Sequence, residues 1–149
     1  MTTSESEGAA GASVGAPAVH TVLYIEDNPA NVKLIEGIFN RVPEVNLVIA
    51  REPLGGLELA HYAKPALIIL DINLPVLDGY EVFERLRADA ATRDIPVLAL
   101  SANAMPVDVE RGRAAGFADY VTKPIQVIAF RDKVLALLAA GAGREHDVQ

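Results

Sequence analysis

The fold is decided by the stretch Ala66-Leu67-Ile68-Ile69-Leu70-Asp71, an unbroken apolar run that ends on a carboxylate. An uninterrupted apolar run of this length is typical of a strand that is buried on both faces. Such strands occur in parallel sheets that carry helices on both sides. The stretch therefore predicts the central strand of an α/β protein, with Asp71 at its carboxyl end.

Further apolar runs surround this stretch, and a helical pattern follows each of them. Helix starts are indicated by Asn28-Pro29, which offers a cap and a first-turn proline, and by Asp78 with Glu81, which can form a capping box. Strand and helix alternate five times, which predicts a doubly wound parallel sheet with right-handed crossovers. We expect the five strands at residues 21–25, 45–49, 66–70, 95–100 and 118–121.

Length and composition predict one folded domain with a tail at each end. The chain has 149 residues, of which 51% are hydrophobic and 22% charged, a composition typical of a globular domain. Residues 1–19 are mostly Ser, Thr, Glu, Gly and Ala, with too little apolar area to offset the entropy of ordering, so we expect a flexible tail there. The folded body is expected at residues 20–140, followed by a C-terminal tail at residues 141–149.

Composition also argues against several classes of function. The chain has no cysteine, which removes disulfides, zinc-finger sites and thiol nucleophiles. Thirteen Lys and Arg against twenty Asp and Glu give a net charge of −7, which argues against direct nucleic-acid binding. No apolar run approaches the roughly 20 residues that span a bilayer, and the N-terminus lacks the pattern of a secretory signal. We therefore expect no membrane insertion.

Polar side chains follow four of the predicted strands, at the edge where open parallel sheets bind ligands. They are Glu26 and Asp27 after the first strand, Asp71 after the third, Ser101 after the fourth and Lys123 after the fifth. With the strand order 2-1-3-4-5, the first and third strands are neighbours and the three carboxylates cluster. Two unit charges 4 Å apart repel by about 4 kcal/mol at an effective dielectric constant of 20, so the cluster needs something to offset this repulsion.

Two arrangements would offset it. One is protonation, with raised pKa values, and the other is a hard divalent cation, for which Mg²⁺ is the best candidate. The ammonium group of Lys123 and the hydroxyl of Ser101 suit an anionic oxygen, so the cluster fits a bound or transferred phosphoryl group. Asp71 is the best candidate for a carboxylate that itself accepts this group, because it ends the central strand.

The same residues resemble the receiver domain of response regulators in two-component signalling, and the match runs in family order over roughly residues 20–140. The resemblance implies a (βα)₅, flavodoxin-like fold with the strand order 2-1-3-4-5. It also implies that Asp71 is phosphorylated from the phosphohistidine of a histidine kinase. The matching pieces are Leu23-Tyr24-Ile25-Glu26-Asp27-Asn28, Leu67-Ile68-Ile69-Leu70-Asp71-Ile72-Asn73-Leu74-Pro75, Asp78-Gly79, Ala99-Leu100-Ser101-Ala102 and Asp119-Tyr120-Val121-Thr122-Lys123-Pro124.

The resemblance further implies a Mg²⁺ site. Asp27, Asp71 and the backbone carbonyl of Asn73 would coordinate the metal, and Glu26 would help to hold it. The family often has two aspartates where this chain has Glu26-Asp27. Because glutamate is longer by one methylene, direct and water-mediated ligation by Glu26 both stay open.

Residues after the fourth and fifth strands would carry the response to phosphorylation. The resemblance implies that Lys123 pairs with the acyl phosphate and that its peptide bond to Pro124 is cis. It implies that Ser101 turns inward onto the phosphate and that Tyr120 follows into the vacated space. The surface that changes would consist of the fourth helix, the fifth strand and the fifth helix.

We therefore expect a stand-alone, cytoplasmic response regulator and not an enzyme. After Lys123-Pro124 the sequence holds one helix and a tail, so the output is expected to be protein contact. A histidine kinase would act upstream, and a histidine phosphotransfer protein or another protein would act downstream. Two alternatives keep the fold, namely a receiver module of a hybrid histidine kinase and an adaptor that works without phosphorylation. A phosphatase with an aspartyl nucleophile is disfavoured, because such enzymes typically have a second aspartate, the general acid, two positions after the nucleophile. Here that position is Asn73, which cannot transfer a proton.

Overall fold

The computed structural model describes residues 19–148. Of the tail expected at residues 1–19, residues 1–18 therefore lie outside the described residues. Strands and helices alternate along the chain as the sequence predicts. Their order is β1 (His20–Ile25), α2 (Pro29–Phe39), β2 (Val45–Ala50), α3 (Pro53–Ala63), β3 (Leu67–Asp71), α4 (Gly79–Ala88), β4 (Val97–Ser101), α5 (Pro106–Ala115), β5 (Asp119–Thr122) and α6 (Val127–Val148).

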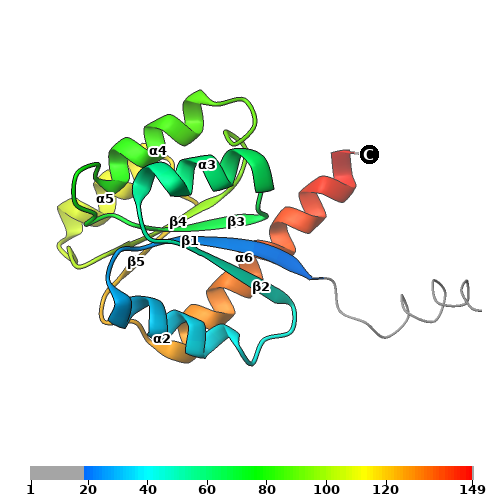
Figure 1. The fold of residues 1–149 in the computed structure, drawn as a ribbon, viewed down its shortest axis with the longest axis horizontal. Coiled ribbons are helices and arrows are strands. Elements are labelled where there is room, and N and C mark those ends of the chain that lie inside the picture. The colour runs from blue at the N-terminus through cyan, green and yellow to red at the C-terminus, as the bar shows by residue number, and fades with distance from the viewer. Residues whose placement is uncertain (1–18, 149) are drawn as a thin grey trace, which may run out of the picture.

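The five strands form one parallel sheet in the order β2-β1-β3-β4-β5 (Figure 1). This confirms the doubly wound, flavodoxin-like fold that the sequence predicts. β3 lies in the middle of the sheet, and all five of its residues are buried. Its neighbours β1 and β4 run in the same direction, so the carboxyl ends of the three strands meet at one edge.

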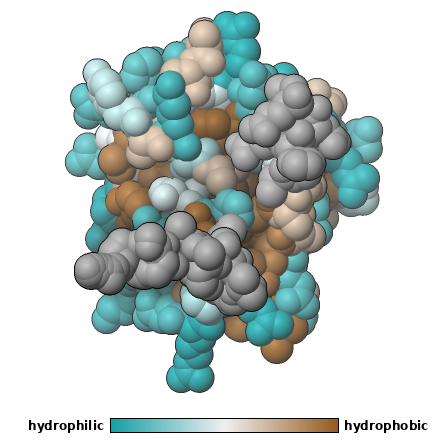
Figure 2. Space-filling model, turned by 90° about the vertical axis from the view of Figure 1, so that its right-hand side faces the viewer, coloured by the Kyte–Doolittle hydropathy of each residue, from teal (hydrophilic) through white to brown (hydrophobic). Residues whose placement is uncertain are grey.

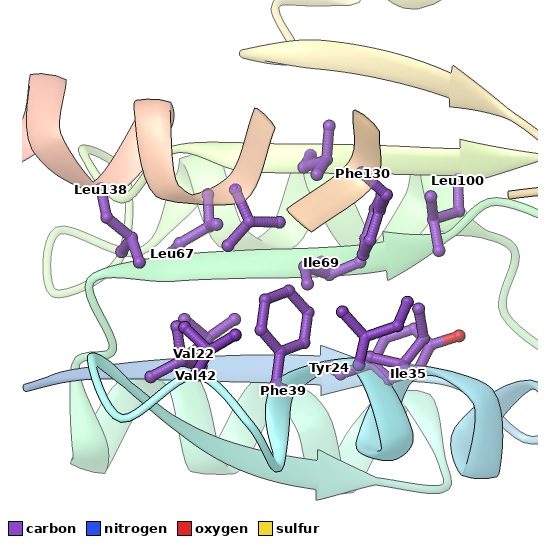
Figure 3. Close-up of a cluster of buried hydrophobic side chains, with 14 of the residues drawn as sticks. Val22, Tyr24, Ile35, Phe39, Val42, Leu67, Ile69, Leu100, Phe130 and Leu138 are labelled. Atoms are coloured by element: carbon purple, nitrogen blue, oxygen red, sulfur yellow. The ribbon is translucent and has the colours of Figure 1, made fainter. Parts of the chain in front are cut away.

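Helices cover both faces of the sheet, with α2 and α6 on one side and α3, α4 and α5 on the other (Figure 1). Figure 3 shows the core under α2 and α6, where Phe39 and Phe130 meet edge to face with ring centroids 6.1 Å apart. Successive strand residues point to opposite faces. Tyr24 therefore joins this core, whereas Leu23 and Ile25 join the core under α3 and α4.

Local signals start the helices where the sequence predicts. The side chain of Asn28 accepts hydrogen bonds from the first backbone amides of α2. Asp78 and Glu81 form a reciprocal capping box at the start of α4. These caps satisfy amide groups that have no partner inside the helix. The caps thus fix where α2 and α4 leave the edge of the sheet at which the polar residues gather.

Several element ends differ from the sequence prediction, among them those of β3, β4 and α6. Asp71 and Ser101 are the last residues of β3 and β4, not the first residues after them. The reason is that sheet hydrogen bonds continue past them, from the Ile72 amide to the Leu100 carbonyl and from the Lys123 amide to the Ser101 carbonyl, each 2.8 Å long. α6 continues to Val148, past the boundary expected at residue 140.

Figure 2 shows the end of the molecule at which the strands begin, opposite their carboxyl ends, as a mixed surface of hydrophobic and hydrophilic residues. A hollow of about 800 Å³ lies at this end, with Pro65, Arg87 and Pro96 among its lining residues. It is far from the carboxyl ends of the strands, so it is separate from the polar residues described below. Within residues 19–148, no helix combines the length and the apolar character that crossing a bilayer requires.

Candidate functional site

Three carboxylates gather at the carboxyl edge of the sheet. Glu26 and Asp27 directly follow β1, and Asp71 ends the neighbouring strand β3. One carboxylate oxygen from each residue lies within 4.8 Å of the other two. Glu26 and Asp71 are buried, while Asp27 is the most exposed of the three. The clustering predicted from the strand order is therefore present in the structure.

Lys123 brings a positive charge to this cluster from the end of β5. Its Nζ lies 3.4 Å from Asp71 Oδ1 and 3.9 Å from Glu26 Oε1. The peptide bond from Lys123 to Pro124 is cis, the isomer that the resemblance implies. Three carboxylates and one ammonium group leave an excess of two negative charges when all are ionised.

Glu26 is held by donors on two elements. Its Oε1 accepts from the hydroxyl of Tyr24 at 2.8 Å and from Asn31 Nδ2 at 3.3 Å, and its Oε2 accepts from the backbone amide of Asn28 at 3.2 Å. Burial, together with the nearby Asp71 carboxylate, raises the pKa of Glu26 to about 7, against the opposing effect of the bonds from Tyr24 and Asn28. Both carboxylate oxygens of Glu26 are thus occupied by the protein itself.

Tyr24 and Asn31 are site residues that the sequence analysis missed. Burial and the charge of Glu26 raise the pKa of Tyr24, so its hydroxyl remains a donor. A signal was present for Tyr24, because a buried tyrosine usually finds a partner for its hydroxyl and Glu26 follows two residues later on the same face. No comparable signal marked Asn31, whose position depends on the phase of α2.

Asp71 is positioned by the loop that follows it. Its Oδ1 accepts from the backbone amide of Asn73 at 2.9 Å, and Asn73 Oδ1 accepts from the amide of Ala102 at 3.1 Å. Gly79 lets α4 begin close to this loop, since a Cβ there would lie 2.9 Å from the carbonyl oxygen of Asp71. The loops after β3 and β4 are therefore joined directly beside the carboxylates.

Ser101 and Tyr120 are linked through one loop residue. Ser101 is fully buried, and its Oγ accepts from the backbone amide of Asn103 at 2.9 Å. The hydroxyl of half-buried Tyr120 donates to the carbonyl of the same Asn103 at 3.1 Å. Ser101 and Tyr120, to which the resemblance assigns the response to phosphorylation, thus bind the backbone amide and the backbone carbonyl of Asn103.

The donor set fits a magnesium ion. Mg²⁺ binds oxygen ligands at about 2.0–2.1 Å in octahedral geometry, so opposite ligands lie about 4 Å apart. The three carboxylates, with oxygens within 4.8 Å of one another, match this spacing with small adjustments. The excess of two negative charges also matches the charge of the ion. The Lys123 ammonium group, 3.4 Å from Asp71, can also pair with an anionic oxygen beside such an ion, which is the arrangement of a phosphoryl site.

Comparison with known proteins covers most of the chain. A family model described as the response regulator receiver domain matches residues 22–135. One relative of the chain is the polar-differentiation response regulator DivK of Brucella anthropi. It is 37% identical over 118 residues, which make up 79% of this chain and 95% of the relative.

Solved structures with the same fold include receiver domains from several bacteria. The signal receiver domain of a LuxO repressor protein from Vibrio parahaemolyticus gives a TM-score of 0.78 at 20% identity, covering 85% of this chain and 95% of its own. The receiver domain of a sensor histidine kinase from Pseudomonas aeruginosa, solved with a magnesium ion coordinated in its active-site cleft, gives a TM-score of 0.73 at 30% identity. That match covers 82% of this chain and 99% of its own.

Proposed function

The chain belongs to the family of response regulator receiver domains, and on this basis we propose that Asp71 is its phosphoacceptor in a two-component system. A receiver domain is a signalling module and not a classical enzyme. The observation that carries the proposal is the position of Asp71, which is buried at the end of the central strand beside a lysine ammonium and two further carboxylates.

The proposed reaction is phosphoryl transfer from a phosphohistidine of a histidine kinase. A carboxylate oxygen of Asp71 attacks phosphorus, the P–O bond forms, the P–N bond breaks, and the imidazole leaves with the electron pair of that bond. Lys123, with Nζ 3.4 Å from Asp71, neutralises charge on the transferred group. The hydroxyl of Ser101 supplies a further donor once it turns toward the phosphoryl oxygens.

Residues of the acidic cluster would hold Mg²⁺ during this reaction. We assign Asp27, Asp71 and the backbone carbonyl of Asn73 as ligands. When bound, the ion supplies positive charge that offsets the repulsion between the carboxylates and the phosphoryl group. Glu26 has both oxygens occupied by Tyr24, Asn31 and Asn28, which favours a water-mediated role over direct ligation.

The proposed output is a change in protein contacts. Ser101 and Tyr120 would transmit the modification to the surface formed by α5, β5 and α6, which carries exposed apolar side chains at Met105, Val107, Val127 and Ile128. The proposed upstream partner is a histidine kinase, and the proposed downstream partner is a histidine phosphotransfer protein or another docking protein, all in the cytoplasm. The likeness to a receiver domain of a sensor kinase supports a second candidate, a receiver module of a hybrid kinase, which would use the same chemistry.

Intact-mass spectrometry tests the phosphoacceptor. The protein is incubated with Mg²⁺ and acetyl phosphate, and a single phosphoryl adduct is expected. Asp71→Asn should abolish the adduct, and EDTA should suppress it in the unaltered protein. Asp94→Asn, an exposed change outside the cluster, is the matched control and should retain the adduct. Absence of an adduct in the unaltered protein, or its persistence in Asp71→Asn, would overturn the proposal, and continuous turnover of organic phosphates would favour a phosphatase.

A further inference from the structure

Gly112 lies inside helix α5 at a point where a side chain cannot fit. It is buried, and a Cβ at this position would overlap Tyr120 Cδ2 and lie 2.7 Å from Tyr120 Cε2. Carbon atoms in contact normally stand about 3.5–4.0 Å apart. The ring of Tyr120 therefore occupies space that is available only because residue 112 is glycine.

Gly112 shares such crowding with Gly56 in α3 and Gly79 in α4, but two other helical glycines of the described residues lack it. Gly37 in α2 and Gly55 in α3 have nothing within 4 Å of an added Cβ. Glycine inside a helix lowers stability relative to alanine, because the unfolded chain gains conformational freedom. At Gly37 and Gly55 no packing contact explains why glycine is present despite this lower helix stability. At Gly112 the contact with Tyr120 explains it.

The seated ring of Tyr120 holds the loop that leads back to the phosphorylation pocket. Its hydroxyl donates to the carbonyl of Asn103 at 3.1 Å, and the amide of Asn103 donates to Ser101 Oγ at 2.9 Å. Ser101 is fully buried at the end of β4. A continuous line of contacts thus runs from Gly112 through Tyr120 and Asn103 to Ser101.

We propose that Gly112 is a positioning residue, whose bare backbone seats the ring of Tyr120 and thereby keeps Ser101 hydrogen-bonded to the Asn103 loop. This inference rests on the proposed function, because the state of Ser101 matters for signalling only if Asp71 accepts a phosphoryl group. A side chain at residue 112 forces the ring into another χ1 rotamer. The bond from the Tyr120 hydroxyl to Asn103 is then lost, and Ser101 is freer to turn toward the phosphoryl oxygens.

The first test is a double-mutant cycle on thermal stability, which needs no phosphorylation. In the background that keeps Tyr120, Gly112→Ala should lower Tm, because the new methyl group displaces the Tyr120 ring. In a Tyr120→Ala background the same change should raise Tm, since no ring is present and alanine favours the helix. Gly37→Ala, the matched control in open space, should raise Tm in both backgrounds. An effect of Gly112→Ala that is equal in both backgrounds overturns the proposal.

The second test follows the rate at which acetyl phosphate and Mg²⁺ produce the phosphoryl adduct. Gly112→Ala should speed adduct formation about two- to tenfold, the factor that loss of one hydrogen bond is worth. Tyr120→Phe, which keeps the ring but removes its hydroxyl, should give a change in the same direction. In the Tyr120→Ala background Gly112→Ala should have no effect on the rate, and Gly37→Ala should have none in either background.

The outcomes separate the two proposals. If the unaltered protein forms no adduct, the phosphoacceptor proposal fails, and the seat for Tyr120 is then judged by the stability cycle together with the amide NMR shifts of residues 101–103. If the adduct forms and the stability cycle shows coupling, but the rate does not change in Gly112→Ala, then Gly112 only packs against Tyr120 and its positioning role is overturned.

Discussion

Replacing Asp27 by asparagine should stabilise the metal-free protein. The clustered oxygens of Glu26, Asp27 and Asp71 lie within 4.8 Å of one another. At an effective dielectric constant of about 20, two unit charges 4.8 Å apart repel by about 3.5 kcal/mol before water and salt screen them further. Lys123 pairs with Glu26 and Asp71. Asparagine at residue 27 therefore removes repulsion without breaking either ion pair.

The expected gain in the free energy of unfolding is about 1 kcal/mol, well below this Coulomb repulsion. Asp27 is the most exposed of the three acids, so water and salt screen its charge. For a domain of this size the gain corresponds to an increase in Tm of about 3 °C. The assay is thermal unfolding followed by circular dichroism in EDTA, with Asp94→Asn as a control that should leave Tm unchanged.

Mg²⁺ should reduce or reverse this difference. An ion at ten times its dissociation constant stabilises the protein that binds it by about 1.4 kcal/mol. The Asp27→Asn variant has lost a charged ligand, so it should gain less from the same concentration. The reasoning is refuted if Asp27→Asn unfolds at or below the temperature of the unaltered protein in EDTA, or if Mg²⁺ stabilises both proteins equally.

Three further perturbations test the charges, the backbone and the core. In metal-free buffer the free energy of unfolding should fall as the pH rises from about 4.5 to 7. The reason is that burial raises the pKa of Glu26 to about 7, so in this range the folded protein keeps a proton that the unfolded chain releases. Urea titrations at several pH values measure this slope, which Glu26→Gln should flatten. Val76→Asn should raise Tm, with a gain of about 1 kcal/mol, because Val76 is fully exposed and has a φ of 70°, which is costly for a β-branched residue. Calorimetry checks this, and an unchanged Tm would mean that the position stores no strain. Phe130→Ala should cost about 3–5 kcal/mol in a guanidinium titration, because Phe130 is buried and packs edge-on against Phe39. A cost below about 1 kcal/mol would contradict its place in the core.

Most of the fold could be predicted because hydrophobicity alone marks the central strands. Residues 67–70 are completely buried, so hydrophobicity marks them without help from the rest of the structure. The strand ends were harder, since Asp71 and Ser101 belong to strands through hydrogen bonds to residues distant in sequence. Glycine at residues 141 and 143 indicates an end of α6 near residue 140, yet the helix continues to Val148. Each glycine costs a helix only about 1 kcal/mol relative to alanine and does not forbid it.

The candidate site was partly predictable because its charged residues lie at the ends of the predicted strands. The order of the strands brings Glu26, Asp27, Asp71 and Lys123 together, and the sequence places each of them at a strand end. The supporting contacts could not be predicted in this way. The contact of Tyr120 with Gly112 depends on a side-chain rotamer and on how α5 packs against β5, and no local pattern in the sequence specifies either.

The last residues of β3 and β4 carry their side-chain oxygens on backbone that is paired with a neighbouring strand. Because Asp71 pairs with Leu100 and Ser101 pairs with Thr122, local opening of this backbone is rare and its amides exchange slowly with deuterium. Rearrangement near these residues must therefore proceed by rotation of side chains on a stationary frame. A deuterium-exchange map of the modified protein should leave the central strands as protected as before and concentrate its differences in the segment 102–105.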